Sequence, residues 1–311
     1  MEQEKKGFIP VMLTPFKDNG DIDYEILTQL TEMYLQAGAS GLFANCLSSE
    51  MFELTDEERL QVIKHVINVV NGAIPVVATG TFGGPITKQA DFVKRVHDTG
   101  TAAVIAITSL LADENEAVAV LNDRVFELID QTPGIPLGFY ECPVPYKRLL
   151  SPQQLTDFVA TGRVIYHKDT CLDINLVKQK LEAGKVNPAF GLYDAYMAHA
   201  VDSLKAGSAG LSCIQGNFFP EMIVWLCNNY ADIALQQEVA MVQQFLIDNM
   251  DVMHNVYPLV AKYYLTKRGL KISTTTRRDV GNFSPAIRNQ IENLYSDYTH
   301  LQSSVGIKNY L

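Results

Sequence analysis

Short apolar runs alternate with longer amphipathic segments along most of this 311-residue chain. The short runs are rich in Val, Ile, Phe and Ala and are typical of buried strands, whereas the longer segments repeat apolar residues at helical spacing. The pattern predicts eight strands, at residues 7–12, 40–44, 75–79, 102–107, 136–140, 164–168, 188–192 and 209–213. It predicts eight helices that follow them, near 24–37, 56–71, 86–98, 114–131, 152–160, 174–183, 194–205 and 218–229.

Strict alternation of strands and helices favours a parallel sheet. Eight such units within about 230 residues favour a closed (β/α)₈ barrel, the TIM-barrel form of the α/β class. An open doubly wound sheet is the alternative, but the first strand is not followed by the GxGxxG pattern of dinucleotide-binding sheets. After residue 230 the strand pattern disappears, and 233–252, 254–269 and 284–303 are predicted to be helices. We therefore expect a barrel at 1–230 and a three-helix C-terminal region at 231–311.

Composition and charge narrow the class of protein. The net charge is −10 without a Lys/Arg-rich block, which argues against a nucleic-acid-binding surface. No apolar stretch reaches the roughly 18 residues of a membrane span, and the charged N-terminal residues do not match a secretory signal. Five scattered cysteines fit reduced thiols better than disulfides or a zinc site. These features predict a soluble cytoplasmic protein, with basic residues at 267–268 and 277–278 on a surface turn.

In a (β/α)₈ barrel, catalytic residues lie at the carboxyl ends of the strands. The predicted strand ends therefore nominate candidate site residues before any relative is considered. These candidates are residues 45–50 after strand two (with Leu47, Ser48, Ser49 and Glu50), residues 79–81 after strand three, Thr108 and Ser109 after strand four, Tyr140 and Glu141 at strand five, Lys168, Asp169 and Thr170 at strand six, Tyr193 and Asp194 at strand seven and Cys213 at strand eight.

Lys168 is the only primary amine among these strand-end candidates. Burial lowers the pKa of a lysine, and the resulting free amine can attack a ketone and form a Schiff base. Strand alternation places Val164, Tyr166 and Lys168 on one inward face. A lysine at a strand end is also commonly solvated or ion-paired, so the pattern by itself leaves both interpretations open.

The neighbouring candidates also have structural interpretations. The phenol of Tyr140 could pass protons to and from a carbinolamine, or it could simply pack in the core with a satisfied hydroxyl. His167 faces the helical layer and is expected to be a hydrogen-bonded structural histidine. Asp169 and Asp173 are expected to accept hydrogen bonds at the start of the next helix, and Glu50 to hold the loop after strand two together.

Several motifs, in the same order along the chain, resemble the dihydrodipicolinate synthase/N-acetylneuraminate lyase family of class I aldolases. The resemblance covers essentially the whole length. The matching motifs are Leu13-Thr14-Pro15-Phe16, Gly20-Asp21-Ile22-Asp23, Ser48-Ser49-Glu50, the PVVATGT segment at 75–81, Tyr140-x-x-Pro143, Lys168-Asp169-Thr170 and the run that ends at Asn217.

The resemblance implies roles for the candidates. In this family a lysine at the end of strand six forms a Schiff base with pyruvate or another 2-oxo acid, and Lys168 occupies that position. The tyrosine at the end of strand five shuttles protons, and it corresponds to Tyr140. The loop after strand two binds the carboxylate, which implies this role for Ser48 with backbone groups of Leu47 and Ser49.

Other positions depart from the family pattern. Leu47 replaces a threonine of the synthases' proton relay, Leu110-Leu111 replaces a tyrosine pair, Pro145 replaces an arginine that binds the second substrate, and Glu141 replaces an asparagine. These departures argue against dihydrodipicolinate synthesis itself.

The positions that hold sugar hydroxyls in the sialic acid lyases are also changed. Asp194 is retained there, whereas Leu192 and Ala195 replace a glycine and a glutamate. Together with Leu47, Leu111 and Tyr166, the bulky Leu192 predicts a smaller and drier pocket.

We therefore expect a class I lyase or aldolase that needs no cofactor or metal, because the iminium serves as the electron sink. Lys168 and Tyr140 would be catalytic, and Ser48, Leu47, Ser49, Asp194, Glu141 and Cys213 would bind substrate. The expected partners are a 2-oxo acid and an aldehyde, and the family suggests a homotetramer or dimer. The alternatives are dihydrodipicolinate synthase proper, a Schiff-base sugar-acid dehydratase and a non-catalytic 2-oxo acid binding protein.

Overall fold

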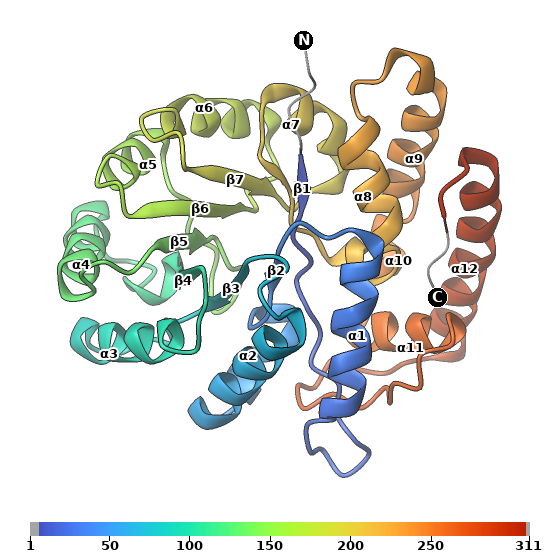
Figure 1. Cartoon of the computed structure of the whole chain (residues 1–311), viewed down its shortest axis with the longest axis horizontal. Coiled ribbons are helices and arrows are strands. Elements are labelled where there is room, and N and C mark those ends of the chain that lie inside the picture. Colours follow the sequence, from blue (N-terminus) through green and yellow to red (C-terminus); the bar gives the residue numbers. More distant parts are fainter. Residues whose placement is uncertain (1–5, 309–311) are drawn as a thin grey trace.

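The structure, a computed structural model, describes residues 6–308 (Figure 1). Eight strands and twelve α-helices follow one another in these described residues. The strands are β1 (Gly7–Phe8), β2 (Leu42–Phe43), β3 (Val76–Thr79), β4 (Ala103–Ile107), β5 (Leu137–Tyr140), β6 (Val164–Asp169), β7 (Gly191–Asp194) and β8 (Gly210–Leu211). The helices that follow them are α1 (Tyr24–Ala37), α2 (Asp56–Val70), α3 (Ile86–His97), α4 (Val118–Gln131), α5 (Pro152–Val159), α6 (Ile174–Gly184), α7 (Ala200–Ala206) and α8 (Pro220–Asn229).

All eight strands are parallel and lie in the order β1-β8-β7-β6-β5-β4-β3-β2. The two strands at the ends of this order are joined by a parallel bridge between Val11 and Phe43. Across it the Phe43 N–H donates to the Pro10 carbonyl at 3.0 Å, and the Met12 N–H donates to the Phe43 carbonyl at 3.1 Å. This bridge closes the sheet, and the helices surround it in Figure 1. The predicted (β/α)₈ barrel is confirmed.

Helices α2 and α5 begin directly after the capping residues Thr55 and Ser151. Each hydroxyl accepts from the backbone N–H three residues later, at Glu58 and Gln154, and each of those side chains accepts from the cap residue's N–H in return. Both caps therefore satisfy otherwise unpaired N–H groups at the helix N-terminus. Strand β7 begins at Gly191 rather than at the predicted residue 188. The Phe190 N–H donates to the Asn187 carbonyl, so residues 187–190 form a turn.

The C-terminal region contains α9 (Gln236–Asp248), α10 (Met250–His254), α11 (Leu259–Lys267) and α12 (Pro285–Val305). The helix predicted at 233–252 is thus interrupted, and α10 is a separate five-residue helix. The helix predicted from 254 begins only at Leu259, because Val256 has a φ of 43° and Pro258 has no backbone N–H to continue a helix. The division of the chain at residue 230 remains a prediction.

The basic surface turn predicted at 267–268 and 277–278 is wrong for two of its arginines. Arg268 forms a salt bridge of 2.9 Å with Glu221, and both side chains are almost fully buried. Arg277 forms two hydrogen bonds of 2.7 and 2.8 Å with the Glu58 carboxylate, which holds the pKa of that group down at about 2. These cations are paired with acids across the fold rather than presented as a basic patch.

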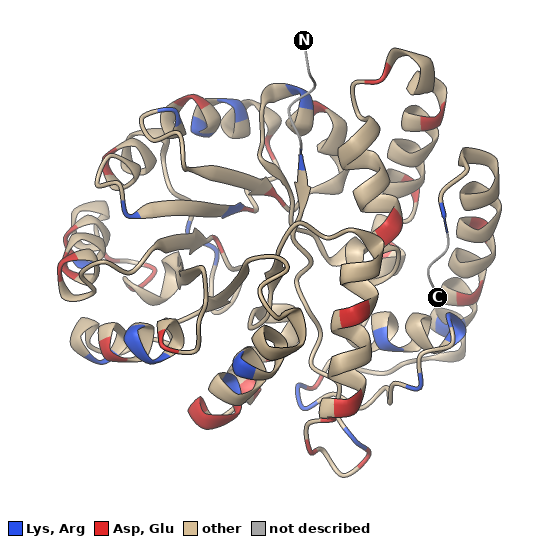
Figure 2. Ribbon diagram, in the orientation of Figure 1, with Lys and Arg blue, Asp and Glu red and all other residues tan. Residues whose placement is uncertain are grey.

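Lys and Arg are intermixed with Asp and Glu along the outer helices in Figure 2. Within residues 6–308, the structure has no helix with both the length and the apolar character that a membrane span requires.

Candidate active site

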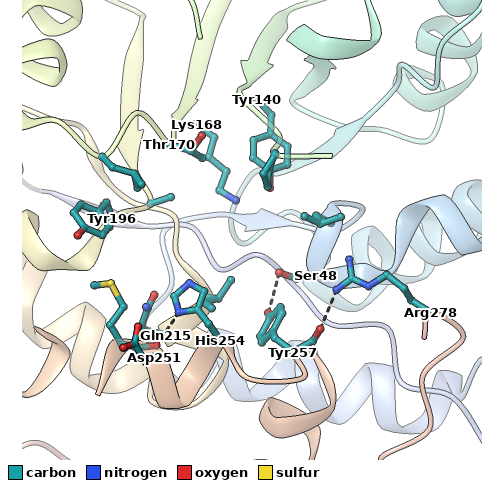
Figure 3. A pocket seen from close by; sticks show the side chains of 16 residues that line it. Ser48, Tyr140, Lys168, Thr170, Tyr196, Gln215, Asp251, His254, Tyr257 and Arg278 are labelled. Atoms are coloured by element: carbon teal, nitrogen blue, oxygen red, sulfur yellow. Dashed lines mark hydrogen bonds between the residues drawn. The ribbon is translucent and has the colours of Figure 1, made fainter. Parts of the chain in front are cut away.

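Lys168 and Tyr140 face each other at the carboxyl ends of two adjacent strands. They are register partners on β6 and β5, so strand alternation sends both side chains to the same inward face. The Nζ atom of Lys168 lies 4.1 Å from the centre of the Tyr140 ring. Figure 3 shows both side chains directed into one cavity from the strand side. The edge of the Phe43 ring packs against Tyr140 from β2, with the ring centres 5.9 Å apart.

The cavity has a volume of about 410 Å³, within the range of small-molecule binding sites. Ten of its sixteen lining residues have polar side chains, whereas most of the exposed surface of its wall is apolar, and the expectation of a smaller and drier pocket stays a prediction. Among the bulky residues named for that expectation, Leu47 lines the cavity, whereas Leu111, Tyr166 and Leu192 are buried elsewhere. The lining residues are Leu47, Ser48, Tyr140, Pro143, Lys168, Thr170, Leu172, Ala195, Tyr196, Ile214, Gln215, Met250, Asp251, His254, Tyr257 and Arg278.

Burial sets the protonation of the two central groups. Desolvation lowers the pKa of Lys168, and the thiols of Cys46, Cys142 and Cys213 oppose this effect only in part. Desolvation also raises the pKa of Tyr140 well above its ordinary value. The cavity therefore favours a neutral amine beside a protonated phenol, which is the pairing that nucleophilic attack and proton donation require.

The loop after β2 contributes Leu47 and Ser48 to the cavity, as expected. Ser49 does not line it, because its hydroxyl donates to the Met12 carbonyl at 2.7 Å and accepts from the Cys46 N–H at 3.1 Å. The Ser49 side chain therefore shapes the loop, and the carboxylate contact expected of its backbone stays a prediction.

Glu50 holds this loop against the C-terminal region. Its carboxylate accepts from Lys262 Nζ at 2.8 Å and from the backbone N–H groups of Arg277 and Arg278 at 2.6 and 3.0 Å. This agrees with the expected structural role, but the partners come from more than 200 residues further along the chain.

Glu141 lies behind the cavity, within a buried ionic cluster. We call Glu141, His167, Asp169 and Lys180 the buried ionic cluster, since all four side chains are fully inaccessible. Lys180 Nζ lies 2.5 Å from the Glu141 carboxylate and 2.7 Å from that of Asp169. Because Tyr140 and Lys168 face inward, Glu141, Asp169 and His167 must face the helical layer. Glu141 therefore lies outside the cavity wall, and this placement gives no support to its expected substrate contact.

The pKa values in the buried ionic cluster follow from competition between burial and pairing. Burial would raise the pKa of Glu141, but His167 and Lys180 bring it below its ordinary value. Burial would lower the pKa of His167, but Glu141 and Asp169 raise it. His167 Nε2 lies 3.5 Å from Glu141 and 3.6 Å from Asp169. The cluster thus pairs two carboxylates with the Lys180 ammonium and with a histidine whose protonation the carboxylates favour.

Donor atoms of Glu141, His167 and Asp169 lie within 4.8 Å of one another, a spacing that a metal ion could accept. The Lys180 ammonium already contacts both carboxylates, so it supplies the positive charge that such an ion would bring. The donor set therefore fits an ion-paired cluster better than a metal centre.

Two further expected substrate contacts lie outside the cavity wall. The Asp194 carboxylate accepts from the Tyr196 N–H and contacts His199 Nε2, both at 2.9 Å, and so holds the turn after β7. Cys213 is 1% exposed at the end of β8, and burial raises the pKa of its thiol to about 12. These side chains are buried beside the cavity rather than in its wall, and their expected substrate contacts stay predictions.

The wall opposite Lys168 comes largely from residues that the sequence did not nominate. Met250, Asp251, His254, Tyr257 and Arg278 belong to the C-terminal region and approach from the far side of the cavity (Figure 3). The sequence offered only an indirect signal, which was the break between the helices predicted at 233–252 and 254–269.

The sequence model of the dihydrodipicolinate synthetase family matches residues 4–297. A 4-hydroxy-tetrahydrodipicolinate synthase from Saccharophagus degradans is 24% identical over 265 residues, covering 85% of this chain and 89% of the relative.

Two solved structures share the fold. YagE, an E. coli K12 prophage protein of the dihydrodipicolinic acid synthase family solved with pyruvate, superposes with a TM-score of 0.84 at 20% identity, covering 97% of this chain and 99% of its own. A monomeric dihydrodipicolinate synthase variant also gives a TM-score of 0.84 at 20% identity, covering 98% of both chains.

Proposed function

The chain belongs to the dihydrodipicolinate synthetase family, and we propose that it is a class I aldolase that forms a Schiff base between Lys168 and pyruvate or a related 2-oxo acid. The chain is a lyase by its family, whose members include the 4-hydroxy-tetrahydrodipicolinate synthases that it resembles. The observation that carries the proposal is the buried Lys168 amine, which lies 4.1 Å from the Tyr140 ring centre and lines an accessible cavity. The pyruvate complex of YagE supports the choice of 2-oxo acid.

Lys168 would act as the nucleophile. Its neutral amine attacks the ketone carbon, the ketone oxygen leaves as water after protonation, and an iminium remains. Loss of a proton from the adjacent carbon gives an enamine, whose carbon attacks an aldehyde. The reverse sequence cleaves the C–C bond. The iminium nitrogen accepts the electron pair in each direction, and hydrolysis of the final iminium restores the amine.

Tyr140 would move the protons of these steps. Its raised pKa keeps the phenol protonated, so it can donate to the carbinolamine oxygen as water departs. Because the phenol and the amine project from register partners, one proton carrier can serve both formation and hydrolysis of the iminium.

The second substrate would occupy the side of the cavity lined by Gln215, Asp251 and His254. The Oε1 atom of Gln215 is buried without a hydrogen-bond partner among the described residues. His254 Nδ1 donates to the Met250 carbonyl at 2.7 Å, which leaves Nε2 for a ligand. With the Asp251 carboxylate, this side offers acceptors to the hydroxyl groups of an aldehyde.

We also propose a cytoplasmic location and a homo-oligomer, a tetramer or a dimer. The acidic composition and the scattered cysteines, all of them free thiols, support the location. Sedimentation equilibrium of the purified chain tests the assembly, and a single monomeric species would exclude a homo-oligomer.

Deuterium exchange at pyruvate C3 tests the proposed function without knowledge of the aldehyde. In D₂O the enamine takes up deuterium, so NMR should show enzyme-dependent loss of the methyl proton signal. K168A should reduce this rate to the uncatalysed background. A chain that binds pyruvate without exchange would instead be a 2-oxo acid binding protein, and the aldolase proposal would be abandoned.

A further inference from the structure

Ser48 stands at the end of a directed chain of hydrogen bonds that begins at Tyr34. The Tyr34 hydroxyl donates to Asn217 Oδ1 at 2.5 Å, and Asn217 Nδ2 donates to the Tyr257 hydroxyl at 2.6 Å. The Tyr257 hydroxyl then donates to Ser48 Oγ at 2.8 Å. Since Asn217 Nδ2 can only donate, the donor order is fixed from Asn217 to Ser48.

This order determines what Ser48 can offer to a ligand. Its oxygen already accepts from Tyr257, and its own proton remains available in a cavity that Lys168 also lines. Ser48 is therefore set as a donor, and its natural partner is an acceptor such as a carboxylate oxygen. A ketone bound to Lys168 carries its carboxylate on the adjacent carbon, so that group must lie in the same cavity.

Arg278 brings a permanent positive charge to the same wall. Its Nη2 donates to the Tyr257 carbonyl at 2.9 Å, and Figure 3 shows the guanidinium beside Tyr257 and Ser48. Within residues 6–308 no carboxylate forms a salt bridge with it; the neighbouring Glu53 influences it only at longer range. A half-buried guanidinium with a single backbone acceptor has donors left for an anion.

The segment that carries Arg278 is firmly held. Glu50 accepts from the backbone N–H of Arg278, and the neighbouring Arg277 pairs with Glu58. The guanidinium is thus presented by an anchored loop, which limits the conformational entropy lost when a ligand binds.

We propose that Arg278 joins Ser48, whose carboxylate contact the family resemblance implies, in binding the carboxylate of the 2-oxo acid, with Tyr257 as a positioning residue that directs the Ser48 proton. This inference rests on the proposed function and assigns the C-terminal region a part in the primary substrate site. Leu47 offers no hydroxyl to the carboxylate, and the charge of Arg278 compensates for that.

Borohydride trapping with two matched ketones tests the carboxylate site. Pyruvate carries the carboxylate, whereas methyl pyruvate carries an uncharged ester beside the same ketone. In R278Q the pyruvate concentration for half-maximal trapping should rise about 10- to 100-fold, as expected for loss of a charge-assisted hydrogen bond, while that for methyl pyruvate stays constant. The half-maximal pyruvate concentration of R278K should lie between those of the wild type and R278Q, because lysine keeps the charge without the planar fork of donors.

Two further variants complete the test. Y257F should raise the half-maximal pyruvate concentration less than R278Q does, again without effect on the ester. R288Q removes an exposed arginine of α12 that is outside the cavity wall, and it should match the wild type.

The outcomes separate this inference from the proposed function. If wild-type protein traps neither ketone, the aldolase proposal itself fails. If the wild type traps pyruvate but R278Q and R278K need no more of it, the carboxylate site is overturned and the function stands. Equal losses for pyruvate and its ester would also overturn it, since they would show a general distortion of the cavity.

Discussion

The Nζ atom of Lys168 lies 4.1 Å from the centre of the Tyr140 ring, and the two residues are register partners on neighbouring strands. The barrel therefore fixes the distance between a free amine and a proton donor through its backbone hydrogen bonds. A relationship set by strand register is rigid, which suits a site where the same two groups must act in several successive proton transfers.

Y140F should slow deuterium exchange at pyruvate C3 by about 10²- to 10⁴-fold, the usual contribution of a positioned acid or base. The phenyl ring retains its contact with Phe43, so the fold should be preserved. NMR gives the exchange rate, and circular dichroism checks the fold. An exchange rate equal to that of the wild type would remove Tyr140 from the proton pathway.

The pH dependence of the same exchange should report Lys168. Burial lowers the pKa of this amine from its ordinary 10.5, so the neutral nucleophile becomes populated at lower pH. We expect the rate, after subtraction of uncatalysed exchange, to rise and level off at a pH below 10.5. A rate that climbs with a midpoint at the ordinary value would show that the amine is solvated.

K180M should destabilise the protein strongly, because it leaves the carboxylates of Glu141 and Asp169 buried without their shared ammonium. Breaking such a pair from one side costs about 3–5 kcal/mol of unfolding free energy. Urea denaturation measures this loss. The matched control is K185M, whose partner Glu182 is exposed and whose loss should leave the stability nearly unchanged. Equal midpoints for K180M and K185M would contradict a structural role for the cluster.

His167 should make stability depend on pH. Its folded-state pKa is raised above the ordinary 6.5 by Glu141 and Asp169, so its protonation stabilises the fold. That contribution is complete below pH 6.5 and is lost as the pH rises through the folded-state value. The stability difference between the wild type and H167Q should therefore shrink with rising pH, as measured by urea titrations from about pH 6 to 9. A constant difference would show that His167 does not change its protonation between about pH 6 and 9, and would contradict the expected titration.

Strand alternation made Lys168 and Tyr140 predictable from the sequence, since it fixes the direction of each side chain once the strand is placed. Applied to the next residue, the same rule would have turned Glu141 away from the cavity. Proximity to a strand end was an insufficient criterion for that residue.

Arg278 and Tyr257 could not be found in this way. Both residues lie in irregular segments, where no strand or helix period gives the direction of a side chain. Their positions depend instead on tertiary contacts, such as the hydrogen bonds from the backbone N–H groups of residues 277 and 278 to Glu50. The sequence predicted residues 231–311 as a separate helical region, and this division hid the part that the region takes in the cavity wall.

Reduction with borohydride in the presence of pyruvate, followed by peptide mapping, tests the Schiff-base assignment most directly. We expect one reduced pyruvate adduct per chain, located on Lys168, and no adduct in K168A. An unmodified Lys168, or an adduct on another lysine that persists in K168A, would contradict the assignment.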